Sequence, residues 1–238
     1  MLKYFATIVI GLAFASIAQA VTYNLTSEFS DANNPNGVWS YRRGTTLLPH
    51  NNNAGANAIN AVATNGFWGD SSDYNSTVFR TTGPGSAASG YNDNDFLAGD
   101  VVAHSTNPSG SSDINVTWTA PGAGSIQYSG AVWYAHSPVT RSNDFMLTLN
   151  NLPPLASGTV GPAQNRPNAM TFNSGGFTSV AAGDELLLYI RPTAGQQFGS
   201  LAGLSLVVNF TPIPEPASIA LMTATAGAVL LRRRRRIS

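Results

Sequence analysis

Short runs of alternating apolar and polar residues dominate the middle of this 238-residue chain. The clearest extends from Ile114 to Trp118, and a Pro-Gly-Ala-Gly turn at 121–124 connects it to a second run from Ile126 to Tyr134. A period of two places successive side chains on opposite faces of a β-strand, whereas an amphipathic helix needs a period of 3.6. The pattern therefore predicts an antiparallel all-β domain.

Similar runs recur on both sides of this pair, at 21–25, 38–41, 101–104, 145–149, 177–180, 186–191 and 204–210. Between residues 48 and 99 the pattern weakens, and we expect long connections there with one or two strands near Val78 to Arg80. About nine or ten strands suit two packed sheets, so the sequence predicts a β-sandwich or jelly roll. An N-terminal signal helix and a C-terminal hydrophobic helix are expected to flank this body.

The body, residues 21–211, is expected to be one domain stabilised by its core, because the chain contains no cysteine for disulfides. The formal charge of the whole chain is zero, but five of its arginines lie in the last seven residues. Between Val21 and Ile213, six arginines face eleven acidic residues, which gives −5. An acidic body argues against nucleic-acid binding.

Residues 1–20 have the organisation of a secretory signal peptide. Lys3 supplies the positive charge, an uncharged stretch follows, and Ala18-Gln19-Ala20 forms a small-residue cleavage site. We therefore predict cleavage by signal peptidase after Ala20 and a mature chain that begins at Val21. The alternative, an uncleaved membrane anchor, is disfavoured because the apolar stretch is short and ends in the Ala-x-Ala site rather than in a flanking charge.

The C-terminal segment, residues 212–238, combines three features. Pro214 and Pro216 favour an extended linker around Glu215, because proline fixes φ and restricts the residue before it. Residues 217–231 are uncharged, and the chain then carries Arg232, Arg233, Arg234, Arg235 and Arg236. The arginines predict a stop-transfer signal with a cytoplasmic C-terminus. Fifteen helical residues rise only about 22 Å, short of a hydrocarbon core of about 30 Å, which favours a transient sorting signal over a permanent tail anchor.

This combination resembles the PEP-CTERM sorting domain. The resemblance covers residues 212–236 and implies that Pro214, Glu215 and Pro216 form the motif recognised by exosortase, a membrane cysteine transpeptidase of bacteria that secrete exopolysaccharide. It further implies a body outside the cytoplasm that is held in the inner membrane before processing and then reaches the cell surface or extracellular matrix. A plain single-pass anchor remains the alternative.

Enzyme and metal motifs give weaker signals. His50, His104 and His136 lack metal-ligand spacing, although His104 and His136 both end predicted strands and could meet. Asp93-Asn94-Asp95 has the oxygen density of a calcium loop without the EF-hand signature, so solvated carboxylates are favoured. Asp184 and Glu185 would face opposite sides of a strand, and Asp184 is more simply a turn residue. We predict no catalytic residues, no cofactor and no metal.

The strand phase separates two tryptophans. Trp118 shares the phase of Ile114 and Val116 and is predicted to lie in the core. Trp133 shares the phase of Gln127 and Ser129, so it either faces solvent, where it could stack on a sugar, or packs beneath residues 48–99.

Two functions follow as hypotheses. The first is an exported, non-enzymatic surface or matrix protein that contacts exopolysaccharide. Its body resembles bacterial surface β-sandwiches that look like carbohydrate-binding modules, on the phrases 34–41, 116–121 and 180–184. The alternative is a secreted carbohydrate-binding module or a glycoside-active enzyme with the same tail. An enzyme requires two converging carboxylates, and a binding module requires exposed aromatic residues or a calcium loop.

Overall fold

The computed structural model describes residues 19–51, 66–69, 76–83, 95–106, 113–137 and 139–213. Most of the predicted signal segment, including Ala18, lies outside this part of the chain. So do the Pro-Glu-Pro motif, the apolar run 217–231 and the arginines 232–236. No helix in the described ranges is long and apolar enough to cross a membrane.

Two antiparallel sheets form the body. Sheet A, the larger, consists of β12 (Met170–Asn173), β9 (Gly124–Tyr134), β15 (Leu201–Pro212), β7 (Val101–His104), β6 (Thr77–Arg80), β5 (Phe67–Gly69) and β4 (His50–Asn51), with β1 (Val21–Asn24) on β15 and β13 (Thr178–Val180) on β9. Sheet B has the order β11 (Ala156–Val160), β10 (Asn143–Leu149), β14 (Glu185–Pro192), β8 (Ile114–Thr119), β2 (Trp39–Arg43) and β3 (Thr46–Leu47). A short helix α1 (Leu25–Glu28) follows β1, and a 3-10 turn η3 (Arg166–Asn168) precedes β12.

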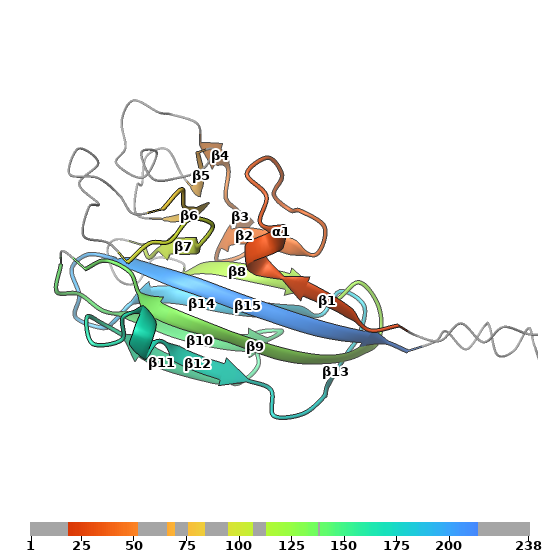
Figure 1. The fold of residues 1–238 in the computed structure, drawn as a ribbon. Helices are drawn as coiled ribbons and strands as arrows, with labels where there is room; N and C mark the ends of the chain where they lie inside the picture. Colours follow the sequence, from red (N-terminus) through yellow and green to blue (C-terminus); the bar gives the residue numbers. More distant parts are fainter. Residues whose placement is uncertain are drawn as a thin grey trace, which may run out of the picture.

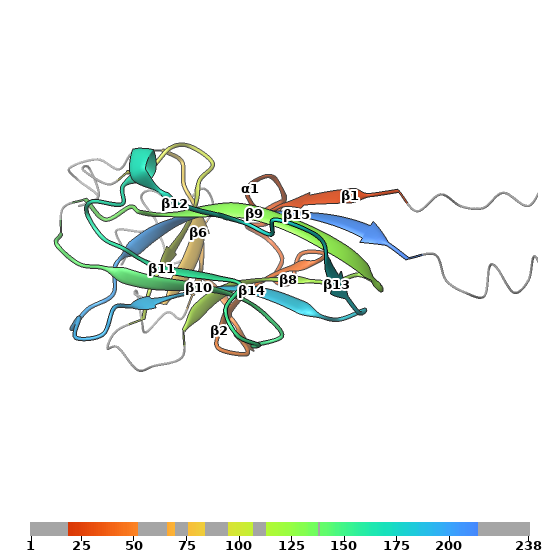
Figure 2. The same ribbon diagram turned by 90° about the horizontal axis from the view of Figure 1, so that it is seen from below.

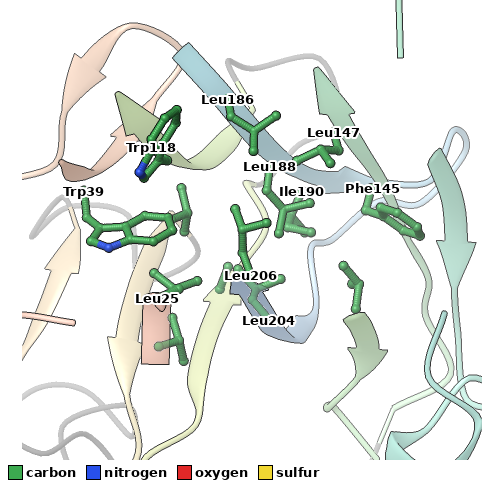
Figure 3. Packing of buried hydrophobic residues seen from close by; sticks show 14 of the residues in the cluster. Leu25, Trp39, Trp118, Phe145, Leu147, Leu186, Leu188, Ile190, Leu204 and Leu206 are labelled. Atoms are coloured by element: carbon green, nitrogen blue, oxygen red, sulfur yellow. The ribbon is translucent and has the colours of Figure 1, made fainter. Parts of the chain in front are cut away.

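The sheets lie face to face, which confirms the predicted β-sandwich. Figure 1 looks onto sheet A with sheet B behind it, and Figure 2 shows the two layers from the side. Trp118 is fully buried between the layers, as its strand phase predicted. Leucines of β14 and β15 pack in the same core between Trp118 and Phe145, among them Leu186, Leu188, Leu204 and Leu206 (Figure 3). Alternation on each strand thus directs one face of each sheet into a shared core.

The predicted strands are present with small shifts at their ends. The first ends at Asn24 rather than Leu25, because the Asn24 side chain caps α1 by accepting from the Thr26 and Ser27 amides. The strand predicted from Phe177 begins at Thr178. Five strands were not predicted, namely β3, β4, β5, β11 and β12.

Both ends of the body leave the sandwich at the same place. β1 runs antiparallel to the end of β15, with Val21 opposite Phe210. We call this the tail end, because the sequence continues from it into the Pro-Glu-Pro segment. The opposite end, the far end, is closed by an inter-sheet hydrogen-bond network. The Ser105 hydroxyl donates to Asn143 Oδ1 at 2.7 Å, and Asn143 Nδ2 donates to the Ser200 carbonyl at 3.0 Å.

Candidate functional site

Strand alternation determines which side chains of sheet A face outward, and on neighbouring strands these side chains line up in rows. On β15, Leu206 and Val208 are buried in the core, so Asn209 faces outward. On β9, Ile126 and Tyr128 are buried, so Gln127 and its outward neighbours face the same side. The alternation in the sequence predicts this outward phase for Gln127 and Ser129, and the structure confirms it.

Uncharged polar side chains occupy this surface toward the tail end. We call it the uncharged face, and its members are Thr22, Ser125, Gln127, Ser129, Thr171, Asn173, Ser179, Ser205, Asn209 and Thr211. They form cross-strand rows, such as Thr22–Asn209–Gln127 and Thr211–Ser125–Ser179. Neighbouring strands lie about 4.8 Å apart, and outward residues repeat about every 6.8 Å along a strand. The rows therefore form an array of hydroxyl and amide groups that is interrupted by two outward-facing, half-buried apolar residues, Ala131 and Val207.

An exposed phenylalanine stands at the edge of this array. Phe177 directly precedes β13, and 69% of its surface is exposed, the largest fraction among the large apolar side chains that the structure describes. Ser179, two residues later, faces outward, so alternation places Phe177 on the same side. Thr178 pairs with Ile126, which puts Phe177 beside Gln127 at the end of the row that begins at Thr22. The sequence pattern places Phe177 in a predicted strand but indicates no role for its side chain.

The outer surface of sheet B differs from the uncharged face in charge. Arg42 and Glu185 form an ion pair at 2.8 Å across it, and Arg191 lies 3.8 Å from Asp113. Burial raises the pKa of Asp113, and Arg191 opposes that shift. The pKa of the half-buried Tyr189 is raised by burial and then by Asp113. Charged groups thus interact mainly with one another on this surface.

Trp133 does not provide the solvent-facing aromatic that was one of its two predicted roles. It lies on the outer side of sheet A, as its phase required, but only 5% of its surface is exposed. Phe67, Phe79 and Phe96 pack into the same cluster and come from the weakly patterned region. The alternative prediction, that Trp133 packs beneath residues 48–99, is confirmed.

Arg166 covers Trp133 from outside. Its guanidinium carbon lies 4.4 Å from the ring centroid, within the range of cation–π attraction. Asp95 accepts from its Nε at 3.0 Å, and Asp100 accepts from its Nη2. Burial would lower the pKa of Arg166, but the hydrogen bonds to Asp100 and Asp95 raise it overall. The far-end half of this sheet surface is therefore closed by a covered aromatic cluster.

Asp95, the one residue of the possible calcium loop 93–95 that the structure describes, is engaged in this ion pair. Asp95 is committed to Arg166, while Asp93 and Asn94 lie outside the described ranges. In the described part of the chain, no three His, Cys, Asp or Glu side chains are close enough together to hold a metal ion.

His104 and His136 meet at the far end, a possibility that the sequence left open. Their ring centroids are 5.9 Å apart. Burial lowers the pKa of His136 to about 3, and the neighbouring His104 and Arg141 add to the effect. His136 therefore carries no charge near neutral pH.

Each carboxylate in the described ranges has a structural partner. Asp184 accepts from the Ala181 amide at 2.7 Å and from Asn150, which confirms its role as a turn residue. The remaining carboxylates bind arginine, tryptophan, threonine or backbone groups, namely Glu28, Asp31, Asp95, Asp100, Asp113, Asp144 and Glu185. These contacts stabilise the loops and strands that carry the carboxylates.

Comparison with known proteins adds three points of reference. No family model and no curated protein matches the sequence. Among solved structures, the chain is similar to the CBM22-1 xylan-binding domain of Paenibacillus barcinonensis Xyn10C, with 12% identity, 64% of this chain and 90% of that chain covered, and a TM-score of 0.35. The C-terminal CBM6 of the laminarinase LamC from Zobellia galactanivorans shows 16% identity over 46% of this chain and 78% of that one, at a TM-score of 0.27.

The third reference is a larger enzyme, the Podospora anserina GH26-CBM35 β-(1,4)-mannanase. It shows 14% identity and a TM-score of 0.29 and is matched over 49% of this chain but 22% of its own length. TM-scores below 0.5 assign no residue of this chain a counterpart in any of the three. The uncharged face is therefore defined by the geometry of this chain alone.

Proposed function

We propose that this protein is an exported, non-enzymatic surface or matrix protein whose uncharged face binds a polysaccharide. The observation that carries the proposal is an exposed array of hydroxyl and amide side chains with the exposed ring of Phe177 at its edge. Hydroxyl and amide groups both donate and accept hydrogen bonds, as sugar hydroxyls require. An exposed aromatic ring offers an apolar surface for the C–H face of a sugar. The array and the ring thus supply both components of sugar recognition.

The charge distribution favours a neutral polysaccharide over an acidic one. No member of the uncharged face is charged, and the body between Val21 and Ile213 has a formal charge of −5. A polyanion would be repelled by the body as a whole without gaining an ion pair at the face. A neutral polysaccharide is not repelled by the charge of the body and needs no ion pair at the face.

Export and sorting complete the proposal. Signal peptidase would release the chain at Ala20, and exosortase would recognise Pro214, Glu215 and Pro216 while the apolar run 217–231 lies in the inner membrane. The tail end of the sandwich supports this arrangement, because Val21 and Phe210 lie side by side there. β1 and β15 leave the sandwich at this end (Figure 1), so with the tail in the membrane the far end would point outward and the outer surface of sheet A would stand along the side of the body.

Replacing Phe177 by alanine is expected to weaken binding to a neutral polysaccharide about tenfold, since a stacked ring contributes about 1.4 kcal/mol. Affinity electrophoresis in gels containing xylan or a neutral β-glucan measures the change, with polygalacturonate as the acidic probe. Phe198→Ala is the matched control, because Phe198 is also an exposed phenylalanine (45%) but lies beside Arg141, outside the uncharged face. The proposal fails if both variants bind alike or if the protein prefers polygalacturonate.

Replacing residues 214–216 by alanines tests the sorting proposal. The protein expressed in its own host should lose the mass of the residues beyond about Pro216 and leave the inner membrane, and the alanine variant should do neither. Intact mass and membrane fractionation report both properties. A chain that keeps Arg232 to Arg236 and remains in the inner membrane regardless of the motif identifies a plain tail anchor instead.

A further inference from the structure

The edges of the two sheets are unequally protected. On one side of the sandwich, sheets B and A end in β3 and β4, each only two residues long. On the other side, sheet B ends in β11, a continuous strand of five residues, and no described strand pairs with its outer edge. Very short edge strands present few backbone groups to another chain, whereas a continuous one is a template for pairing.

Strand β11 lacks the features that usually block pairing. Its sequence, Ala156-Ser157-Gly158-Thr159-Val160, contains no charge and no proline. The neighbouring edge of sheet A is less suitable, because residues 174–177 interrupt it between β12 and β13. Figure 2 shows β11 on the same side of the sandwich as β12, in the opposite layer. The open backbone edge of sheet B therefore lies at β11.

We propose that β11 pairs antiparallel with β11 of a second copy of this chain, about a two-fold axis at Gly158. A five-residue strand pairs completely with itself only when its third residue lies on the axis. Ser157 then lies opposite Thr159 of the second copy on the outer surface. The Thr159 hydroxyl donates to Asp144 at 2.7 Å, so it can still accept a hydrogen bond from Ser157 across the axis. Ala156 lies opposite Val160 toward the core, and no like charges meet across the axis.

The same symmetry limits assembly to a dimer. A two-fold interface uses the same surface of both copies, so the pair has no further β11 edge to offer. Its outer edges are the two-residue strands β3. The two six-stranded sheets would join into one continuous sheet without extending into a fibre.

Two consequences rest on the proposed function, whereas the pairing itself does not. The axis relating antiparallel strands is perpendicular to the sheet, so both uncharged faces point to the same side. Two faces on one rigid dimer would bind a long polysaccharide with avidity. The tail ends point in opposite directions, so two copies with their tails in one flat membrane cannot pair in this way. The dimer therefore belongs to chains released from the membrane.

The absence of cysteine from the chain allows a direct test. Ser157→Cys and Thr159→Cys are made as separate variants of the full-length chain, purified in mild detergent. The proposed register expects an oxidised, disulfide-linked dimer when the two variants are mixed and little when either is alone, because residue 157 faces 159 of the other copy. Equal cross-linking in each single variant contradicts the register, and no cross-linking in the mixture contradicts the pairing.

A variant that adds a positive charge to β11 provides a second test of the pairing. Thr159→Lys places an ammonium group on the edge and should shift the mass measured by light scattering from dimer to monomer. Ser129→Lys is the matched control, since Ser129 is an exposed hydroxyl on β9, a strand paired on both sides, and it should leave the dimer unchanged. A monomeric parent protein overturns the proposal. Polysaccharide binding by the Thr159→Lys monomer separates this outcome from failure of the proposed function.

Discussion

Gly203→Ala is expected to lower the free energy of unfolding by about 3 kcal/mol, at the upper end of overpacking effects. Gly203 pairs with Trp133 across β15 and β9, and the indole ring lies directly over it. A Cβ atom at residue 203 would be 1.9 Å from Cε2 of Trp133. The ring cannot move outward without displacing Arg166, which lies over it at 4.4 Å. Urea denaturation followed by circular dichroism measures the loss.

A double-mutant cycle separates the clash from a general effect of alanine. In a Trp133→Ala background the ring is gone, so adding Gly203→Ala should cost little more. Gly176→Ala serves as the control, because a Cβ atom there has no heavy atom within 4 Å and its φ is not positive. An equal cost of Gly203→Ala in both backgrounds contradicts contact with the ring as the cause.

The strands that sequence analysis found are those whose alternation is set by large residues. β8 and β14 each direct three large apolar side chains into the core, so their period of two is visible in the sequence. β11 was missed because it consists of small residues, with a glycine at its centre. β5 was missed because its three residues are all buried, which removes the alternation altogether. Strand pairing, rather than local pattern, determines both elements.

The sequence predicted which side chains of the candidate site face outward, but it did not predict which aromatic residue is exposed. Alternation alone correctly placed Gln127 and Ser129 outside, and by the same rule Trp133. Whether an outward side chain is exposed depends on what lies over it, and Arg166 is 33 residues away along the chain. Gly203 was the one local signal, because a glycine within a strand often marks the close approach of another group. The exposure of Phe177 was not predictable from the sequence, because it depends on β13 beginning one residue later, at Thr178.

Acidification from pH 7 to pH 5 is expected to lower the free energy of unfolding by about 2 kcal/mol through His136 alone. In the folded protein, burial, then His104 and Arg141, lower the pKa of His136 from 6.5 to about 3. The unfolded chain therefore binds a proton between these pH values that the folded protein does not. Stability from this group is complete above pH 6.5 and is lost as the pH falls toward about 3.

His136→Gln isolates this contribution, because glutamine does not titrate and the other ionisable groups remain in both proteins. Urea denaturation of parent and variant at pH 7 and pH 5 should give a pH-dependent loss about 2 kcal/mol smaller in the variant, even if the variant is less stable at both values. NMR titration of the ring C–H resonance of His136 gives the folded pKa independently. Equal losses in the two proteins would mean that water or a conformational change lets the folded protein protonate His136. The far end would then be less tightly packed around His104 and Arg141 than the structure shows.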